Sequence, residues 1–92
     1  MGDAPTADTH RTPRRVLERF SANFVGAWQD AGLTQGQLVE RSELHHTQIR
    51  RLKRGVNLPH IGTLVRLAAA LGVPPAELCA GIVWDPERQR FE

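Results

Sequence analysis

The sequence predicts a small all-α domain of five helices that contains a helix-turn-helix, followed by a short C-terminal extension. Apolar residues recur at intervals of three and four along most of the chain, which is the period of an amphipathic helix. Glycine and proline fall between these segments, where helices are expected to end or begin. The 92 residues, of which 40% are hydrophobic, suffice for one modest core.

The N-terminal part is expected to form a tail and one long helix. Residues 1–11 lack apolar periodicity, so we expect a disordered tail. Thr12 as the N-cap and Pro13 as the first helical residue predict a helix that runs to about Asp30 and is ended by Gly32. The apolar stripe of this helix consists of Leu17, Phe20, Phe24, Ala27 and Ala31.

Two short helical patterns joined by a three-residue turn occupy residues 34–55. Thr34 and Gln37 have the spacing of a capping box, which predicts the start of the first helix. The second helix is expected to cover residues 46–54 and to end at Gly55. A helix, a tight turn and a second helix together are the layout of a helix-turn-helix.

The second of these helices is expected to bury one face and to expose a basic one. When Ile49 and Leu52 face inward, the opposite face carries several arginines. Arginine binds guanine edges in a bidentate way and also pairs with phosphates, so the pattern favours a DNA-binding face. On composition alone, a solvated charged face is the alternative. The exposed residues are His46, Thr47, Arg50, Arg51 and Arg54, with Lys53 at the border.

Two further helices are expected beyond a loop that contains Pro59. The first is predicted over Ile61–Leu71 and is terminated by Gly72. The second is short and runs from Pro75 to about Cys79, with Leu78 directed inward and Cys79 itself a small buried residue. The apolar face of the longer helix consists of Ile61, Leu64, Val65, Leu67, Ala68 and Leu71.

The last twelve residues differ in character from the helical part. Residues 82–84 are β-branched and aromatic, residues 85–88 suit a turn, and residues 89–91 can return as a second strand. We therefore expect a C-terminal β-hairpin, with an irregular tail as the alternative. A helix-turn-helix domain over residues 12–80 and an extension over residues 81–92 follow as the domain boundaries.

Taken together, these segments resemble the phage-repressor and Cro-like (Xre) family of DNA-binding domains. The resemblance covers roughly Phe20 to Leu78, and its motifs are specific only in combination. Three positions depart from the family pattern. Glu43 stands in the turn where Gly is most frequent, His45 stands at an N-cap where Ser or Thr is usual, and Val39 replaces the usual Ala. The matching residues are Gln35, Leu38, Val39, Leu44, Ile49, Leu52, Gly55, Pro59, Thr63, Leu64, Leu67, Ala68, Leu71, Gly72 and Val73.

The resemblance implies a sequence-specific transcriptional regulator of double-stranded DNA, most often a repressor that acts as a homodimer. By resemblance, the helix over residues 46–54 enters the major groove, where His46, Thr47 and Arg51 contact bases. Gln35 matches a residue that holds a phosphate, and Arg54 and Asn57 lie where the following loop meets the DNA backbone. The DNA-binding residues expected from this resemblance are Gln35, His45, His46, Thr47, Arg50, Arg51, Arg54 and Asn57.

Other functional classes find less support in the sequence. The four histidines lack the spacing of a metal site, and no nucleophile with a base and an acid is recognisable, so we expect no cofactor and no enzymatic activity. No signal peptide or membrane span is recognisable either, so we expect a cytoplasmic protein. A second arginine cluster either touches DNA as an arm or keeps the tail soluble. That cluster consists of Arg11, Arg14, Arg15 and Arg19.

Dimer contacts are expected from the fifth helix and from the segment Ile82–Phe91, in which Trp84 and Phe91 are the apolar candidates.

The same fold could also serve as a protein-interaction module. The alternative functions are therefore an antitoxin that would still bind DNA, or a protein-interaction module whose arginine face is dispensable. In either case the C-terminal tail would contact the protein partner.

Overall fold

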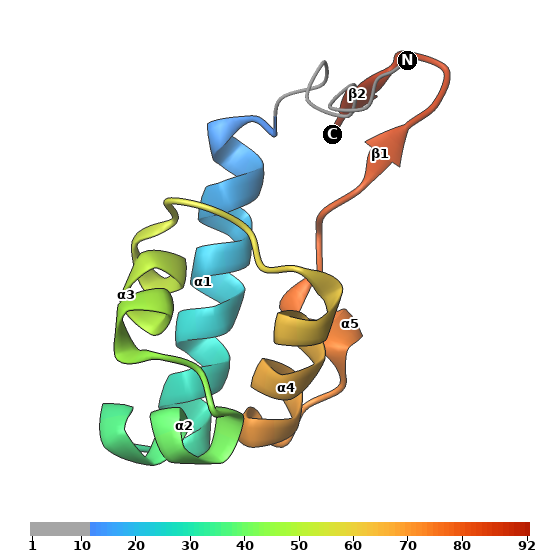
Figure 1. Ribbon diagram of the computed structural model, residues 1–92. Helices are drawn as coiled ribbons and strands as arrows, with labels where there is room; N and C mark the ends of the chain where they lie inside the picture. Colours follow the sequence, from blue (N-terminus) through green and yellow to red (C-terminus); the bar gives the residue numbers. More distant parts are fainter. Residues whose placement is uncertain (1–11) are drawn as a thin grey trace.

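The computed structural model describes residues 12–92, and these residues form five helices and a small antiparallel hairpin. The predicted all-α fold and the C-terminal hairpin are therefore confirmed, while the predicted tail over residues 1–11 lies outside the described residues. In Figure 1 the long first helix runs through the middle, with α3 to one side, α4 and α5 to the other, and α2 across its lower end. The elements are α1 (Arg14–Ala31), α2 (Gln35–Ser42), α3 (His46–Arg54), α4 (Ile61–Leu71), α5 (Pro75–Leu78), β1 (Trp84–Asp85) and β2 (Arg90–Phe91).

The first helix begins one residue later than the sequence predicted. Pro13 occupies the N-cap position with an extended backbone, at φ −67° and ψ 155°, and no side chain caps the helix. The Pro13 carbonyl oxygen accepts from the amides of Val16 and Leu17. The expectation that Thr12 caps this helix is thus wrong, because the last extended residue is the proline itself. The other end was predicted correctly, since Gly32 adopts a left-handed conformation at φ 68°.

Every helix, together with the turn between α2 and α3, contributes to one core around α1. The ring of Phe24 stacks against that of Trp28 at 5.5 Å between centroids, and the Trp28 indole N–H donates to the Leu33 carbonyl oxygen at 2.7 Å. This bond ties the end of α1 to the loop that leads into α2. The largest fully buried side chains are Phe24, Leu38, Leu44, Ile49, Leu67 and Leu78.

Some side chains that the periodicity placed in the core lie outside it. Leu17 is only half-buried, and its neighbour Val16 is buried instead. On α4, Ile61 is 74% exposed and Val65 is 48% exposed. Ile61 is the first residue of the helix, and Val65 lies about 100° around the axis from Leu64, so both fall at the margin of the packed face.

At the other end of the helical domain, α5 ends at Leu78 rather than at Cys79. Leu78 is buried as predicted. The Cys79 thiol was expected to be buried but is only half-buried, because Cys79 lies in the turn after the helix.

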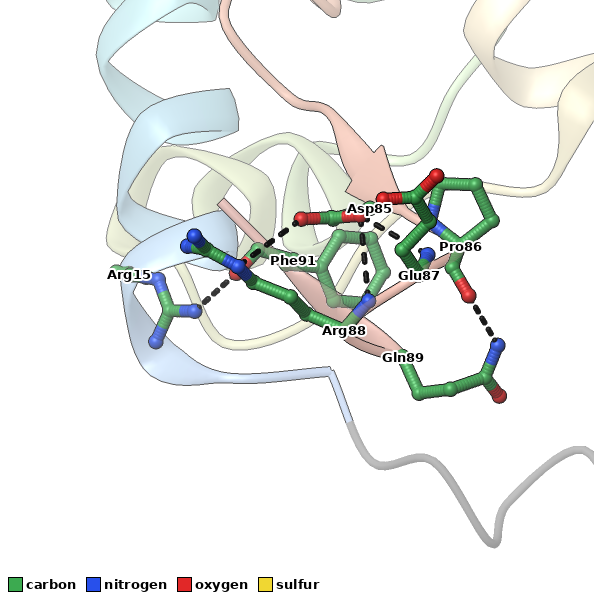
Figure 2. Close-up of polar contacts among 7 residues, drawn as sticks. All are labelled: Arg15, Asp85, Pro86, Glu87, Arg88, Gln89 and Phe91. Carbon is green, nitrogen blue, oxygen red and sulfur yellow. Dashed lines mark hydrogen bonds and ion pairs between the residues drawn. The ribbon is translucent and has the colours of Figure 1, made fainter.

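Contacts among its own residues help to hold the C-terminal hairpin, and Figure 2 shows those of its turn. Trp84 pairs with Phe91, and their rings meet edge to face at 5.1 Å. A carboxylate oxygen of Asp85 accepts from the amides of Glu87 and Arg88 and so organises the turn. The two aromatic rings thus contact each other, and the expectation that they pack on another subunit stays a prediction.

One hydrogen bond joins this hairpin to α1. A guanidinium N–H of Arg15 donates to the Phe91 carbonyl oxygen at 2.5 Å, as Figure 2 shows. The hairpin therefore lies beside the first turn of α1.

Candidate nucleic-acid interface

The first helix of the predicted helix-turn-helix begins with a complete capping box. The Thr34 hydroxyl accepts from the Gln37 amide at 3.1 Å, and the Gln37 side-chain oxygen accepts from the Thr34 amide at 2.8 Å. The predicted box is therefore confirmed. It fixes the N-terminus of α2, where the exposed Gln35 is the first helical residue. The positive end of a helix dipole at this position favours a nearby anion.

The turn between α2 and α3 is held by two buried residues and contains one strained residue. The buried Ser42 hydroxyl donates to the Leu38 carbonyl oxygen at 2.7 Å and accepts from the Leu44 amide at 3.2 Å. Leu44 is itself buried in the core. Glu43, which stands where the family most often has glycine, adopts a left-handed conformation at φ 59° and ψ 26°. A non-glycine residue in this conformation costs roughly 1 kcal/mol.

At the start of α3, His45 acts as a working N-cap. Its Nδ1 accepts from the Thr47 amide at 3.1 Å, and the Gln48 side-chain oxygen accepts from the His45 amide at 3.3 Å. The imidazole rings of His45 and His46 lie 4.3 Å apart between centroids. Because Nδ1 of His45 accepts the Thr47 amide, only Nε2 of this imidazole can hydrogen-bond to a ligand.

The two faces of α3 divide as the sequence predicted. Ile49 and Leu52 are buried against the core, whereas the five residues predicted on the opposite face are exposed. Within residues 12–92, the guanidinium groups of this face make no hydrogen bond or ion pair, so their donors are available to a ligand. We call these five residues the α3 face: His46, Thr47, Arg50, Arg51 and Arg54.

Two other basic residues of the segment 34–55, Arg41 and Lys53, make contacts within the protein. The Lys53 ammonium lies 5.6 Å from the centroid of the Trp28 ring, on the side of α3 that packs on α1. The Arg41 guanidinium donates through Nε to the Ala70 carbonyl oxygen at 3.0 Å, at the C-terminal end of α4. The basic segment of the sequence thus contains residues with structural contacts as well as residues that face solvent.

Beyond α3, the chain forms a notch that brings Arg51 and Asn57 together. This hollow of about 140 Å³ is lined by the end of α3, the following loop and the first turn of α4. His60 occupies the N-cap of α4, and no side chain caps that helix. The first amides of α4 therefore give the notch a positive end. The lining residues are Gln48, Arg51, Leu52, Asn57, Leu58, Pro59, His60 and Thr63.

The N-terminal arginines contact other parts of the chain. Arg14 pairs with Glu18 at 3.9 Å, and Arg15 hydrogen-bonds to the hairpin. The Arg19 guanidinium lies close to Gly81: a Cβ added to Gly81 would be 2.8 Å from Nη1 of Arg19. Arg11 lies outside the described residues, and the choice between a DNA-contacting arm and charge that keeps the tail soluble stays open.

Sequence reasoning missed one residue near this interface. Arg66 of α4 donates through Nε to the Ser42 carbonyl oxygen at 3.1 Å and through Nη2 to the Glu43 carbonyl oxygen at 3.2 Å. An arginine on the outer side of an amphipathic helix is usually solvated, so its position in the sequence carried no signal.

Two kinds of feature were also searched for in the described part of the chain. None of the helices in residues 12–92 combines the length and hydropathy that crossing a bilayer requires. Over the same residues, no group of three or more His, Cys, Asp or Glu side chains is arranged to hold a metal ion.

Comparison with known proteins identifies the family of the chain. An uncharacterised HTH-type transcriptional regulator of Sinorhizobium fredii, y4dJ, is 39% identical to it over 57 residues, which are 62% of this chain and 74% of the relative. No solved structure matches the chain significantly. Residues 28–80, more than half of the chain, match the family described as a helix-turn-helix domain. The chain therefore belongs to this family of helix-turn-helix domains.

Proposed function

We propose that this protein is a sequence-specific transcriptional regulator that binds double-stranded DNA, of the phage-repressor and Cro-like (Xre) type. Membership of a helix-turn-helix family and a relative named as a transcriptional regulator support the regulator function. One observation carries the proposal, namely that α3 presents exposed arginines, which have no partner within residues 12–92, directly after a tightly held turn. Such a helix suits the major groove, which admits an α-helix and displays base edges to it.

The proposed roles of the side chains follow from their positions on α3 and around it. His46, Thr47 and Arg51 contact base edges, because the N-terminal part of a recognition helix lies deepest in the groove. Arg50 and Arg54 pair mainly with phosphates and set the affinity. Gln35 and Asn57, with the helix N-terminus beside each of them, hold further phosphates. His45 caps α3 and adds its remaining imidazole edge to the interface.

The regulator acts in this proposal as a homodimer that represses by occupying a promoter. Two recognition helices would enter successive major grooves about 34 Å apart on an inverted repeat. The surface proposed for dimerisation comprises α5 and the segment Ile82–Phe91, in which Val83 is 48% exposed and Trp84 is 36% exposed. We place the regulator in the cytoplasm. We keep the domain boundaries of 12–80 for the DNA-binding domain and 81–92 for the extension.

The same C-terminal segment favours a second candidate function. A hairpin that is joined to the helical domain through Arg15 and exposes Val83 could serve a protein partner. The chain would then be an antitoxin or an interaction module with the same fold. A pure interaction module predicts that the α3 face is dispensable.

A salt-dependent binding titration on the upstream region of the protein's own gene tests the proposed function. The wild type should bind a specific site tightly, with an affinity that falls steeply as salt rises. Arg51→Ala should lose about 10- to 100-fold in specific affinity, since a bidentate arginine–guanine pair discriminates by about 1–3 kcal/mol. Arg41→Ala removes the same charge from α2 and should leave specific binding unchanged per folded molecule. Weak, sequence-blind association at every salt concentration would favour the interaction module.

A further inference from the structure

An arginine of α2 hydrogen-bonds to the C-terminal end of α4, and an arginine of α4 hydrogen-bonds to the C-terminal end of α2. Arg41 of α2 donates to the Ala70 carbonyl oxygen near the end of α4 at 3.0 Å. Arg66 of α4 donates to the Ser42 and Glu43 carbonyl oxygens at the end of α2, at 3.1 and 3.2 Å. The last carbonyls of a helix lack partners within that helix, and a guanidinium group satisfies them while complementing the negative end of the dipole.

The two contacts are chemically alike but differ in what they hold. Arg41 contacts a helix end that leads into α5, whereas Arg66 bridges two successive carbonyls of the turn that leads into α3. One of these carbonyls belongs to Glu43, the residue with φ 59°. Unlike Ser42 and Leu44, which also hold this turn, Arg66 comes from outside the helix-turn-helix segment.

From these contacts, and resting on the proposed function, we infer that Arg66 is a positioning residue for DNA reading by α3. The fork of Arg66 holds the turn in the left-handed conformation that Glu43 disfavours. Only Leu44 and His45 separate Glu43 from the first turn of α3. Without Arg66, the turn can relax toward a right-handed conformation, which would shift the end of α3 that carries His46 and Thr47.

The test compares four variants with the wild type on two duplexes. One duplex is selected by the wild-type protein from a randomised library, and the other is its shuffled sequence. Arg66→Ala should lower specific affinity by on the order of tenfold, the equivalent of about one lost charged hydrogen bond, with the salt slope and the shuffled-duplex affinity unchanged. Arg66→Lys should lose nearly as much, because a lysine ammonium cannot reproduce the planar fork.

The other two variants make the comparison specific to the turn. Arg41→Ala removes the matched contact from the other end of the α2–α4 pair and should leave specific affinity unchanged per folded molecule. The double variant Glu43→Gly/Arg66→Ala should regain most of the lost affinity, because glycine holds the left-handed conformation without steric cost. Circular dichroism at the assay temperature ensures that only folded protein is compared.

Several results would overturn the inference. Unchanged specific affinity in Arg66→Ala would contradict it. Wild-type affinity in Arg66→Lys would also contradict it, because that result would indicate a simple phosphate contact. An equal loss in Arg41→Ala would indicate general loosening of the α2–α4 pair, and failure of Glu43→Gly to restore binding would separate Arg66 from the turn.

A measurement on the free protein keeps this inference distinct from the proposed function. Amide hydrogen exchange at residues 44–47 should rise several-fold in Arg66→Ala and stay unchanged in Arg41→Ala. If the wild type does not distinguish the two duplexes, the proposed function fails. The exchange data then still decide whether Arg66 holds the turn.

Discussion

The arginines of the α3 face and those at the start of α1 share the same chemistry and are all exposed, but they differ in their contacts within the protein. Arg50, Arg51 and Arg54 are exposed and, within residues 12–92, have no internal acceptor. At the start of α1, Arg15 donates to the hairpin and Arg19 lies against Gly81. A basic cluster in a sequence can therefore serve an external ligand or an internal contact, and the acceptors that the fold brings near it distinguish the two.

The largest effect that this comparison predicts concerns the salt dependence of DNA binding. Arg50→Ala/Arg54→Ala should lower the slope of log affinity against log salt by about 1.8 for each bound protomer and weaken binding about 100-fold per protomer at low salt. Arg15→Ala/Arg19→Ala removes the same charge from the start of α1 and should leave the slope nearly unchanged. Fluorescence anisotropy over a range of salt concentrations measures both. Equal changes in slope would show that the α1 arginines also contact phosphates.

A smaller effect is expected at the N-cap of α3. His45→Ala removes the acceptor of the Thr47 amide and should lower the free energy of unfolding by about 1 kcal/mol. His45→Ser keeps a capping oxygen and should be at least as stable as the wild type. Urea denaturation monitored by circular dichroism compares the two variants. If serine destabilised the protein as much as alanine, the imidazole would contribute through its contact with His46 rather than through the cap.

A local effect is expected when the hairpin loses its link to α1. Arg15→Met keeps an apolar stem but removes the donor to the Phe91 carbonyl oxygen, so stability should fall by about 0.5 kcal/mol. Amide exchange in the strands around Trp84 and Phe91 should rise, while exchange in α3 stays the same. Arg90→Met, in the same hairpin, is the matched control. Unchanged exchange in the Arg15 variant would show that the hairpin is held without this hydrogen bond, through contacts such as the edge-to-face ring pair.

The smallest effect separates Lys53 from its arginine neighbours on α3. Because the Lys53 ammonium lies over the Trp28 ring, Lys53→Met should cost about 0.5 kcal/mol of stability and leave the salt slope of DNA binding unchanged. Thermal unfolding and the anisotropy titration measure these two quantities. A fall of about 0.9 in the slope for each bound protomer would instead place Lys53 on a phosphate.

Much of the fold follows from local rules that the sequence displays. The box at Thr34, the helix ends at Gly32, Gly55 and Gly72, and the left-handed Glu43 each depend on a few neighbouring residues. The hairpin and the division of α3 into two faces were also predicted from local patterns.

What the sequence did not predict depends on partners far along the chain. The acceptor of Arg15 is 76 residues away, and that of the Arg66 Nε is 24 residues away. Likewise, Ile61 and Val65 fit the apolar period of α4 but lie where no element of residues 12–92 covers them. Periodicity gives the direction of a side chain from its helix axis but not which element lies opposite.

The most direct test of the proposed reading by α3 is an NMR titration that observes arginine side chains. Protein labelled with ¹⁵N, with Nε–Hε signals assigned by single substitutions, is titrated with a duplex from the upstream region of its own gene. The signals of Arg50, Arg51 and Arg54 should shift and become protected from exchange, while those of Arg15, Arg41 and Arg66 stay in place. Shifts confined to Arg15 and Arg19, with an unmoved α3 face, would contradict the account.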